Sequence, residues 1–347
     1  MRTPRPLTLI VLTLVLVTGA TICWELFLRG KGLKPDYDDS PELWADKRAR
    51  VYEPADKTTV FIGSSRIKYD LDVDTWQNMA GTNAIQLAMV GSSPRTMLSD
   101  LASDPNFKGN LIVDVTEILF FNPAPQVNLT PNEAINFYHK RTPAQKVSFE
   151  LDKLLEPRLV MLDKDFYSLN GLLDHLYVPN RDGVYAGLDF PIGFHQTLYS
   201  RQNKMTDPFL ADTVRINKVR AIWGGLGRLK GPPPVSGKAL DSILFSVKHD
   251  VDLIRARGGT VLFLRTPSTG PFLMGEKMGY PKEKYWDKLL AVTQCKGIHF
   301  SEHASLNNLM CPEFSHLSPH DAVLYTKGII QILKKENQMA TIISSVR

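Results

Sequence analysis

The chain has 347 residues, of which 43% are hydrophobic and 22% are charged, a composition typical of a globular protein with one large domain or two small ones. Its net charge of +5 is small and scattered, which argues against nucleic acid as a partner, because nucleic-acid binding needs a concentrated basic face. The 23 glycines and 23 prolines follow no period, which excludes collagen-like and low-complexity sequence.

The first element is an uncharged apolar run at residues 7–24, preceded by Arg2 and Arg5. Its length is sufficient to span a bilayer. A cleaved signal peptide is the alternative, because small residues occur at 18–20, but the apolar run continues beyond them and favours a retained anchor over residues 1–28. The preceding positive charges predict a cytoplasmic N-terminus. The remainder would then lie outside the cytoplasm, in the periplasm of a Gram-negative cell.

Residues 29–57 are dense in charges of both signs and contain three prolines. This composition is typical of an exposed, irregular segment. We therefore expect a stalk that carries one short helix at residues 41–50.

The pattern then changes to short apolar, β-branched runs that alternate with helical patterns, which predicts a parallel sheet covered by helices on both faces. The expected strands are residues 58–62, 84–90, 111–115, 260–264 and 297–300. The expected helices are residues 94–101, 240–257, 282–294 and 319–336.

These elements predict a three-layer α/β/α, flavodoxin-like domain over residues 58–338, followed by a tail at residues 339–347. Residues 120–239 do not follow the alternation. Because they contain helical patterns at 143–155 and 207–223, we expect them to form a largely helical insertion.

Two short motifs at opposite ends of this domain carry candidate chemistry. Gly63-Ser64-Ser65 follows the first strand, where a hydroxyl can project into the crevice at the sheet's edge. Glu313 precedes His316 by three residues, so the carboxylate can orient the imidazole as a general base. Each motif alone also fits a structural role, a helix N-cap for the serine and a helix-start residue for the histidine.

Together these motifs resemble the SGNH (GDSL-like) hydrolase superfamily. The resemblance covers residues 58–118 and 240–338, and it implies Ser65 as nucleophile, with His316 and Glu313 completing a Ser-His-Glu triad. It also implies an oxyanion hole formed by the main chain of Ser65 and Gly91. The family's Gly-x-Asn-Asp block is missing here, and Thr116 occupies roughly its place.

The anchor, stalk and insertion resemble membrane-tethered SGNH proteins of the cell envelope. That resemblance implies an O-acyl(acetyl)transferase that acts on an extracytoplasmic glycan through an acyl-Ser65 intermediate, without a cofactor. The partners it implies are an acyl donor or acylated glycan and a multi-span membrane acyltransferase. The alternatives are a carbohydrate esterase or deacetylase, a lipase-like hydrolase, and a catalytically degenerate scaffold or glycan-binding protein.

Three further features have alternative interpretations. Arg66 could contact an anionic substrate or form a structural ion pair. Cys295 and Cys311 would lie in an oxidising space and could form a disulfide or remain as two buried thiols. Residues 299–303 read His-x-x-Glu-His, but no helical pattern places both imidazoles on one face, so no metal site is expected.

Overall fold

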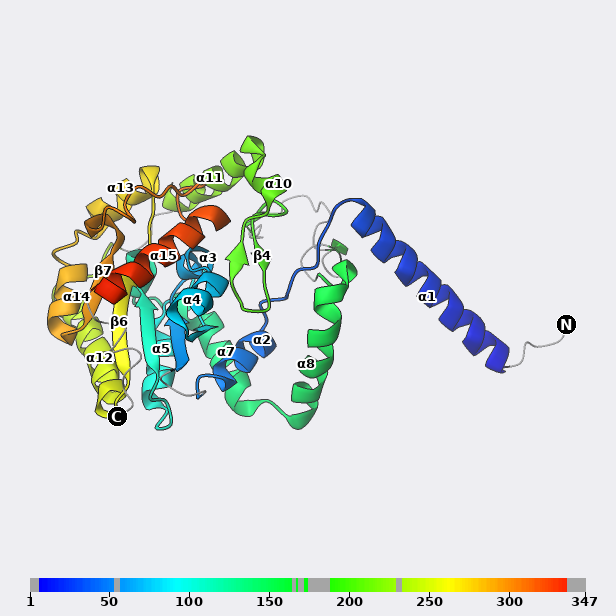
Figure 1. Cartoon of the computed structure of the whole chain (residues 1–347), viewed down its shortest axis with the longest axis horizontal. Helices are drawn as coiled ribbons and strands as arrows, with labels where there is room; N and C mark the ends of the chain where they lie inside the picture. The colour runs from blue at the N-terminus through cyan, green and yellow to red at the C-terminus, as the bar shows by residue number, and fades with distance from the viewer. Residues whose placement is uncertain are drawn as a thin grey trace. The chain divides into compact units, whose positions relative to one another are not determined.

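The computed structural model describes residues 6–52, 57–163, 167, 172–173, 188–228 and 233–335 (Figure 1). The chain divides into two compact units. The N-terminal unit comprises Met1–Asp38 and Thr142–Gly187, and the α/β unit comprises Asp39–Arg141 and Leu188–Arg347. The predicted tail, residues 339–347, lies outside the described residues.

The α/β unit is built on a five-stranded parallel sheet with the order β2-β1-β3-β6-β7. Numbered within the sheet, this order is 2-1-3-4-5, the order of flavodoxin-like doubly wound sheets. All five strands lie where the sequence predicts them, although the second is shorter than expected. The strands are β1 (Thr58–Ile62), β2 (Asn83–Gln86), β3 (Asn110–Asp114), β6 (Thr260–Arg265) and β7 (Lys296–His299).

Alternate side chains of the strands enter two separate cores, because successive residues of a strand point to opposite faces. In β1, Val60 and Ile62 enter one core and Phe61 enters the other. The first face is covered by α5 (Arg95–Ser103), α12 (Gly237–Ala256) and α14 (Trp286–Thr293). The second is covered by α3 (Ser65–Asp70), α4 (Val73–Ala80) and α15 (Pro319–Lys335). The α/β class and the three layers are therefore observed.

The short helix expected at residues 41–50 is present, but it packs into the core of the α/β unit and does not belong to a solvated stalk. Helix α2 (Pro41–Ala49) belongs to the α/β unit, where Trp44 is buried in the first core and donates a hydrogen bond to the Leu87 carbonyl at 3.0 Å. Arg48 is also buried and pairs with Asp100 at 2.7 Å. The charges that suggested a solvated stalk are partly neutralised by ion pairs that only the folded chain provides.

The predicted insertion, residues 120–239, is not one body. Its first part, with α6 (Glu117–Phe120), η2 (Pro125–Asn128) and α7 (Leu129–Lys140), stays in the α/β unit, where α7 packs against α2 and α5. Its middle belongs to the N-terminal unit.

The last part returns to the α/β unit with a small antiparallel pair, β4 (Gln196–Thr197) and β5 (Asn203–Lys204), and then α10 (Asp207–Leu210) and α11 (Thr213–Arg228). A third, largely aromatic core forms between these elements and α3, with Tyr69, Phe194 and Phe209 buried in it. Among the described residues of this unit, the other elements are α13 (Gly270–Gly279) and η5 (Phe300–Glu302).

The N-terminal unit contains α1 (Pro6–Gly30), which is long and apolar enough to cross a membrane. It also contains α8 (Pro143–Leu155), which matches the predicted helix, and two short 3-10 helices, η3 (Glu156–Arg158) and η4 (Val160–Leu162). The Glu25 carboxylate near the end of α1 accepts hydrogen bonds from the main chain of Val160 at 3.0 Å and Met161 at 2.9 Å. Helix α1 is therefore joined to the segment that follows α8.

Candidate active site

Ser65 begins α3 directly after the turn that leaves β1. A Cβ at Gly63 would lie 2.7 Å from the Asp114 Cβ and 2.6 Å from Cγ2 of Ile67, so only glycine fits this turn. Ser64 caps the helix by accepting the Arg66 main-chain N–H at 3.4 Å. The sheet order reverses between β1 and β3, and ligands of doubly wound sheets bind at such a switch point. The local sequence thus places the Ser65 hydroxyl at the expected edge.

Glu313, His316 and Ser65 form a continuous chain of hydrogen bonds. The His316 Nδ1 is 2.8 Å from Oε1 of Glu313, and the His316 Nε2 is 2.9 Å from the Ser65 Oγ. An ionised carboxylate can only accept, so Nδ1 carries the proton and Nε2 is left to accept the Ser65 hydroxyl. The Glu313 Oε1 also accepts the His316 main-chain N–H at 2.6 Å. This is the arrangement that a serine nucleophile and its general base require.

Helix α11 contacts the loop that carries Glu313 and His316. The Trp223 indole N–H donates to Oε2 of Glu313, so both oxygens of this buried carboxylate are hydrogen-bonded. One turn earlier, Arg220 donates to the Pro312 carbonyl from Nε at 3.0 Å and from Nη2 at 2.6 Å. Its guanidinium also lies 4.7 Å from the ring centre of Phe314. Sequence reasoning missed Trp223 and Arg220, because no motif marks them.

Three aromatic rings surround the His316 imidazole. The ring centres of Tyr69, Phe194 and Trp223 lie 4.4, 5.9 and 6.1 Å from the imidazole centre. Only 2% of the His316 surface is exposed. Apolar surroundings of this kind exclude water and strengthen the electrostatic interactions inside the site.

Asp70 connects the helix that begins with Ser65 to the loop that carries His316. It is the last residue of α3, and its Oδ1 accepts the Leu317 main-chain N–H at 2.8 Å. Burial raises the pKa of Asp70 well above its ordinary value, and the charge of nearby Asp114 acts in the same direction, against the lowering effect of the Leu317 N–H. Asp70 lies five positions after Ser65, but nothing in the sequence indicates this role.

The predicted oxyanion residues lie near the turn after β1. The Met89 main-chain N–H donates to the Gly63 carbonyl at 3.1 Å, so the residues just before Gly91 lie beside the turn that leaves β1. Gly91 has a positive φ of 63° and is exposed. The Thr116 hydroxyl lies 2.7 Å from the Ser64 Oγ and donates to Asp114 at 3.2 Å. Because the single hydroxyl hydrogen of Thr116 is donated to Asp114, this side chain cannot also donate to an oxyanion in this arrangement. The oxyanion role of the Ser65 and Gly91 N–H groups stays a prediction.

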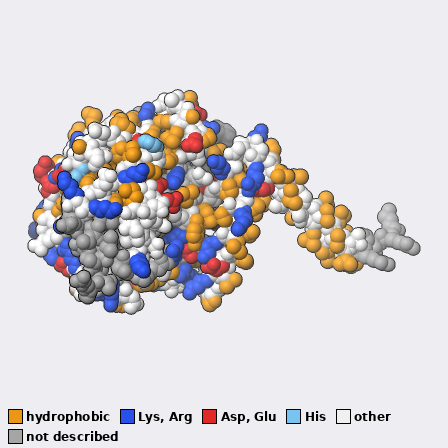
Figure 2. Space-filling view, in the orientation of Figure 1, with side chains coloured by type: hydrophobic (Ala, Val, Ile, Leu, Met, Phe, Trp, Pro, Cys, Tyr) orange, Lys and Arg blue, Asp and Glu red, His pale blue; other side chains and the backbone are white. Residues whose placement is uncertain are grey.

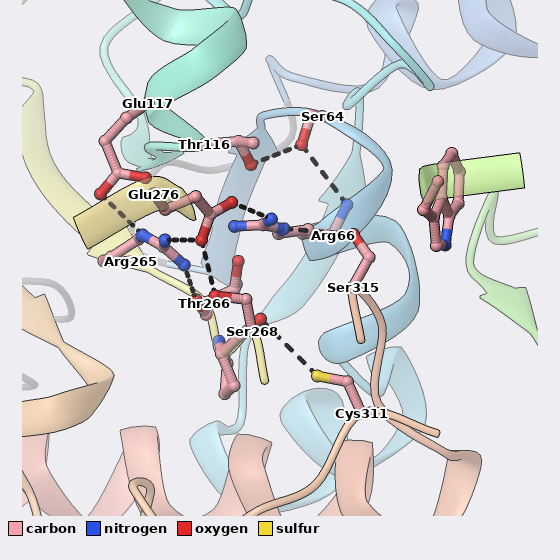
Figure 3. Close-up of polar contacts among 12 residues, drawn as sticks. Ser64, Arg66, Thr116, Glu117, Arg265, Thr266, Ser268, Glu276, Cys311 and Ser315 are labelled. Atoms are coloured by element: carbon pink, nitrogen blue, oxygen red, sulfur yellow. Dashed lines mark hydrogen bonds and ion pairs between the residues drawn. The ribbon is translucent and has the colours of Figure 1, made fainter. Parts of the chain in front are cut away.

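Arg66 is part of a buried chain of ion pairs with Glu276, Arg265 and Glu117 (Figure 3). Only 1% of it is exposed, and it pairs with Glu276, which also accepts from Arg265 at 2.6 Å. Arg265 in turn pairs with Glu117 at 2.8 Å. Burial would raise the pKa of Glu276, but the charges of Arg66 and Arg265 outweigh it and lower the pKa to about 2. The structure therefore supports the ion-pair interpretation of Arg66 over contact with substrate.

Of the two alternatives for Cys295 and Cys311, the structure has the buried free thiols and not the disulfide. Cys295 and Cys311 are both free, and they are buried in different cores, Cys295 with α12 and α14 and Cys311 with α15. The sheet lies between these cores, so the two sulfurs cannot meet. Burial raises the pKa of both thiols.

The His-x-x-Glu-His segment forms the end of β7 and η5. Burial lowers the pKa of His299 to about 3, and its Nδ1 lies 2.8 Å from the Ser301 hydroxyl. Within the described ranges, no group of three or more His, Cys, Asp or Glu side chains is arranged to hold a metal ion.

No protein-family model matches this chain, and no curated protein matches it.

Proposed function

We propose that this protein is a membrane-anchored serine acyl-ester enzyme of the SGNH kind. Its most direct assignment is an O-acyl(acetyl)transferase that modifies a glycan outside the cytoplasm. The observation that carries the proposal is the hydrogen-bonded chain from Glu313 through His316 to the Ser65 hydroxyl. A degenerate scaffold has no need for this alignment.

The chemistry follows from the same three residues. As Ser65 Oγ attacks the acyl carbonyl, His316 Nε2 takes the hydroxyl proton, and Glu313 stabilises the resulting imidazolium. The main-chain N–H groups of Ser65 and Gly91 would stabilise the oxyanion. His316 then returns the proton to the leaving oxygen, which leaves an acyl-Ser65 ester. In the second half, His316 deprotonates the incoming hydroxyl, which takes the acyl group and restores Ser65.

The surroundings of His316 favour a glycan hydroxyl over water as acceptor. The rings of Tyr69, Phe194 and Trp223 limit solvent at the imidazole, and water competes with the acceptor for the acyl-enzyme. An esterase, in which water takes the acyl group, is the second candidate. The absence of the family's Asn-containing block weakens both enzymatic candidates and is the main support for the scaffold alternative, since loss of one oxyanion donor can cost about a hundredfold in rate.

The test uses the full chain in membranes, both purified into lipid nanodiscs and in native membranes that retain the proposed acyltransferase partner. It is given an activated acetyl ester or the native acyl supply, with and without envelope glycan. Intact mass should show one acetyl group on the protein, and product analysis should show acetylated glycan above the yield of free acetate. Ser65→Ala and His316→Ala should each abolish both signals, while Ser305→Ala, at an exposed serine, should not.

The outcomes separate the candidates. Free acetate without glycan transfer selects the esterase. Turnover that survives Ser65→Ala would overturn the assignment of the nucleophile. If neither preparation acylates Ser65, the enzyme proposal fails and the scaffold or glycan-binding alternative replaces it.

A further inference from the structure

Helix α8 of the N-terminal unit carries an exposed apolar stripe. Val147, Leu151, Leu154 and Leu155 are exposed by 63%, 58%, 56% and 48%. Their spacing of i, i+4, i+7 and i+8 places them on one face of the helix. Hydrophobic side chains are visible along this helix in Figure 2. A soluble helix normally turns such a stripe toward a core.

The opposite side of α8 carries Lys146, Asp152 and Lys153 around Phe149, which is buried in the protein. Lys153 also pairs with Glu150 at 2.8 Å. A capping box begins the helix, with Thr142 and Gln145 each satisfying the other's main chain. The helix is therefore well defined and about 20 Å long at 1.5 Å per residue. One face is apolar and exposed, and the opposite face combines polar side chains with the buried Phe149.

The position of α8 relative to α1 indicates what covers the stripe. Directly after α8, Val160 and Met161 donate their main-chain N–H groups to Glu25, and the Arg158 carbonyl accepts from Arg29. Glu25 and Arg29 are the first charged residues after the uncharged run of α1, so they mark the level at which a membrane-spanning α1 would leave the hydrocarbon. In a membrane crossed by α1, the segment that follows α8 would thus lie at the lipid headgroups. Both helices end near the same point (Figure 1).

We propose that α8 is an interfacial helix whose stripe of Val147, Leu151, Leu154 and Leu155 inserts into the bilayer surface beside α1. Amphipathic helices of this type lie in the interface with the apolar face toward the acyl chains. The bilayer is thus the occupant of this face, and α1 and α8 give the N-terminal unit two contacts with the membrane instead of one. This inference rests on the membrane anchor of the proposed function but not on the proposed catalysis.

Site-specific fluorescence in lipid nanodiscs tests the proposal with the full chain. Cys23→Ser removes the exposed thiol, while the buried thiols of Cys295 and Cys311 are protected in the folded chain. Single cysteines are then introduced as Leu151→Cys on the stripe and Lys146→Cys on the opposite face, and each is labelled with an environment-sensitive dye. A third variant, Leu14→Cys in the middle of α1, reports on the anchor separately.

The Leu151→Cys label should be blue-shifted and quenched several-fold by lipids that carry a quencher near the headgroup. The Lys146→Cys label should be quenched much less, and the Leu14→Cys label should be quenched by quenchers deep in the acyl chains. Quenching of the Leu14→Cys label alone would overturn the interfacial helix and leave the anchor intact. A blue shift of the Leu151→Cys label without lipid quenching would mean that protein covers the stripe, which also overturns the proposal. Loss of quenching at all three positions would overturn the anchor and the interfacial helix together.

Discussion

At the scale of single residues, Glu313 shows how a carboxylate with one more methylene than aspartate serves this site. Its Oε1 accepts both the main-chain and ring N–H groups of His316, and its Oε2 accepts Trp223. Glutamate and histidine three residues apart can thus form a closed local ring, and the second oxygen remains available for a partner from α11. The spacing in the sequence predicts the first contact but contains no information on the second.

Asp70 makes the free energy of unfolding depend on pH. Because burial raises its pKa, the folded chain keeps the proton on Asp70 at pH values where the unfolded chain has lost it. The folded state then binds more protons, so this group lowers the free energy of unfolding as pH rises above about 4. Asp70→Asn keeps an acceptor for the Leu317 N–H and removes the titration. Relative to the wild type, the free energy of unfolding of the variant should increase by about 1.4 kcal/mol for each pH unit between about 4 and the raised pKa of Asp70.

Urea unfolding at a series of pH values between 4 and 8 measures this difference. The curves of Asp74→Asn, a change at an exposed carboxylate of the neighbouring helix, should run parallel to those of the wild type. Parallel curves for Asp70→Asn as well would show that Asp70 ionises normally in the folded protein.

At the scale of elements, α11 connects residues of the predicted insertion to the loop that carries Glu313 and His316. Its Arg220 and Trp223 lie one turn apart and contact Pro312, Glu313 and Phe314. Phe314 has a positive φ of 81°, which is unfavourable for a residue other than glycine. The contacts from α11 help to hold the loop in this conformation, so the insertion is part of the site's support.

Trp223→Phe isolates this support, because it keeps an aromatic ring and removes the N–H donor. A hydrogen bond to a charged group contributes about 1.5–3 kcal/mol, so we expect kcat to fall roughly tenfold to a hundredfold. KM should change little, since Trp223 acts through Glu313. Steady-state kinetics with an activated acetyl ester measure both constants.

Val214→Ala, at an exposed position of the same helix, is the matched control and should retain wild-type kinetics. An unchanged kcat for Trp223→Phe would mean that Oε2 of Glu313 does not need this donor. A change in KM alone would place Trp223 in substrate binding.

At the scale of the whole molecule, the sheet of the α/β unit separates two hydrophobic cores, and each of these cores contains one cysteine. Cys295 and Cys311 are 16 residues apart in sequence, yet they belong to opposite sides of the sheet. We therefore expect both to remain thiols even in an oxidising compartment. Protein unfolded without reductant should alkylate at Cys23, Cys295 and Cys311, as counted by intact mass.

A sample treated with reductant before alkylation provides the reference for three modified thiols. Modification of Cys23 alone in the sample without reductant would show that a Cys295–Cys311 bridge forms and that the fold around these residues differs from the one described.

The sequence by itself determined the α/β class, the five strands and the two motifs of the candidate site. Apolar alternation and strand-end glycines are local signals, and Glu313 and His316 lie within one turn of chain. Their approach to Ser65 could be anticipated because the carboxyl ends of parallel strands share one edge.

Only the tertiary structure decided the burial of Trp44 and Arg48, the free state of the cysteines, and the roles of Asp70, Arg66 and Trp223. Each of these depends on a contact between distant segments, such as the 90 residues that separate Trp223 from Glu313. A charged or aromatic side chain has the same local pattern whether it is solvated or paired. Its state is settled by the partner that folding brings to it, which lies outside any local window of the sequence.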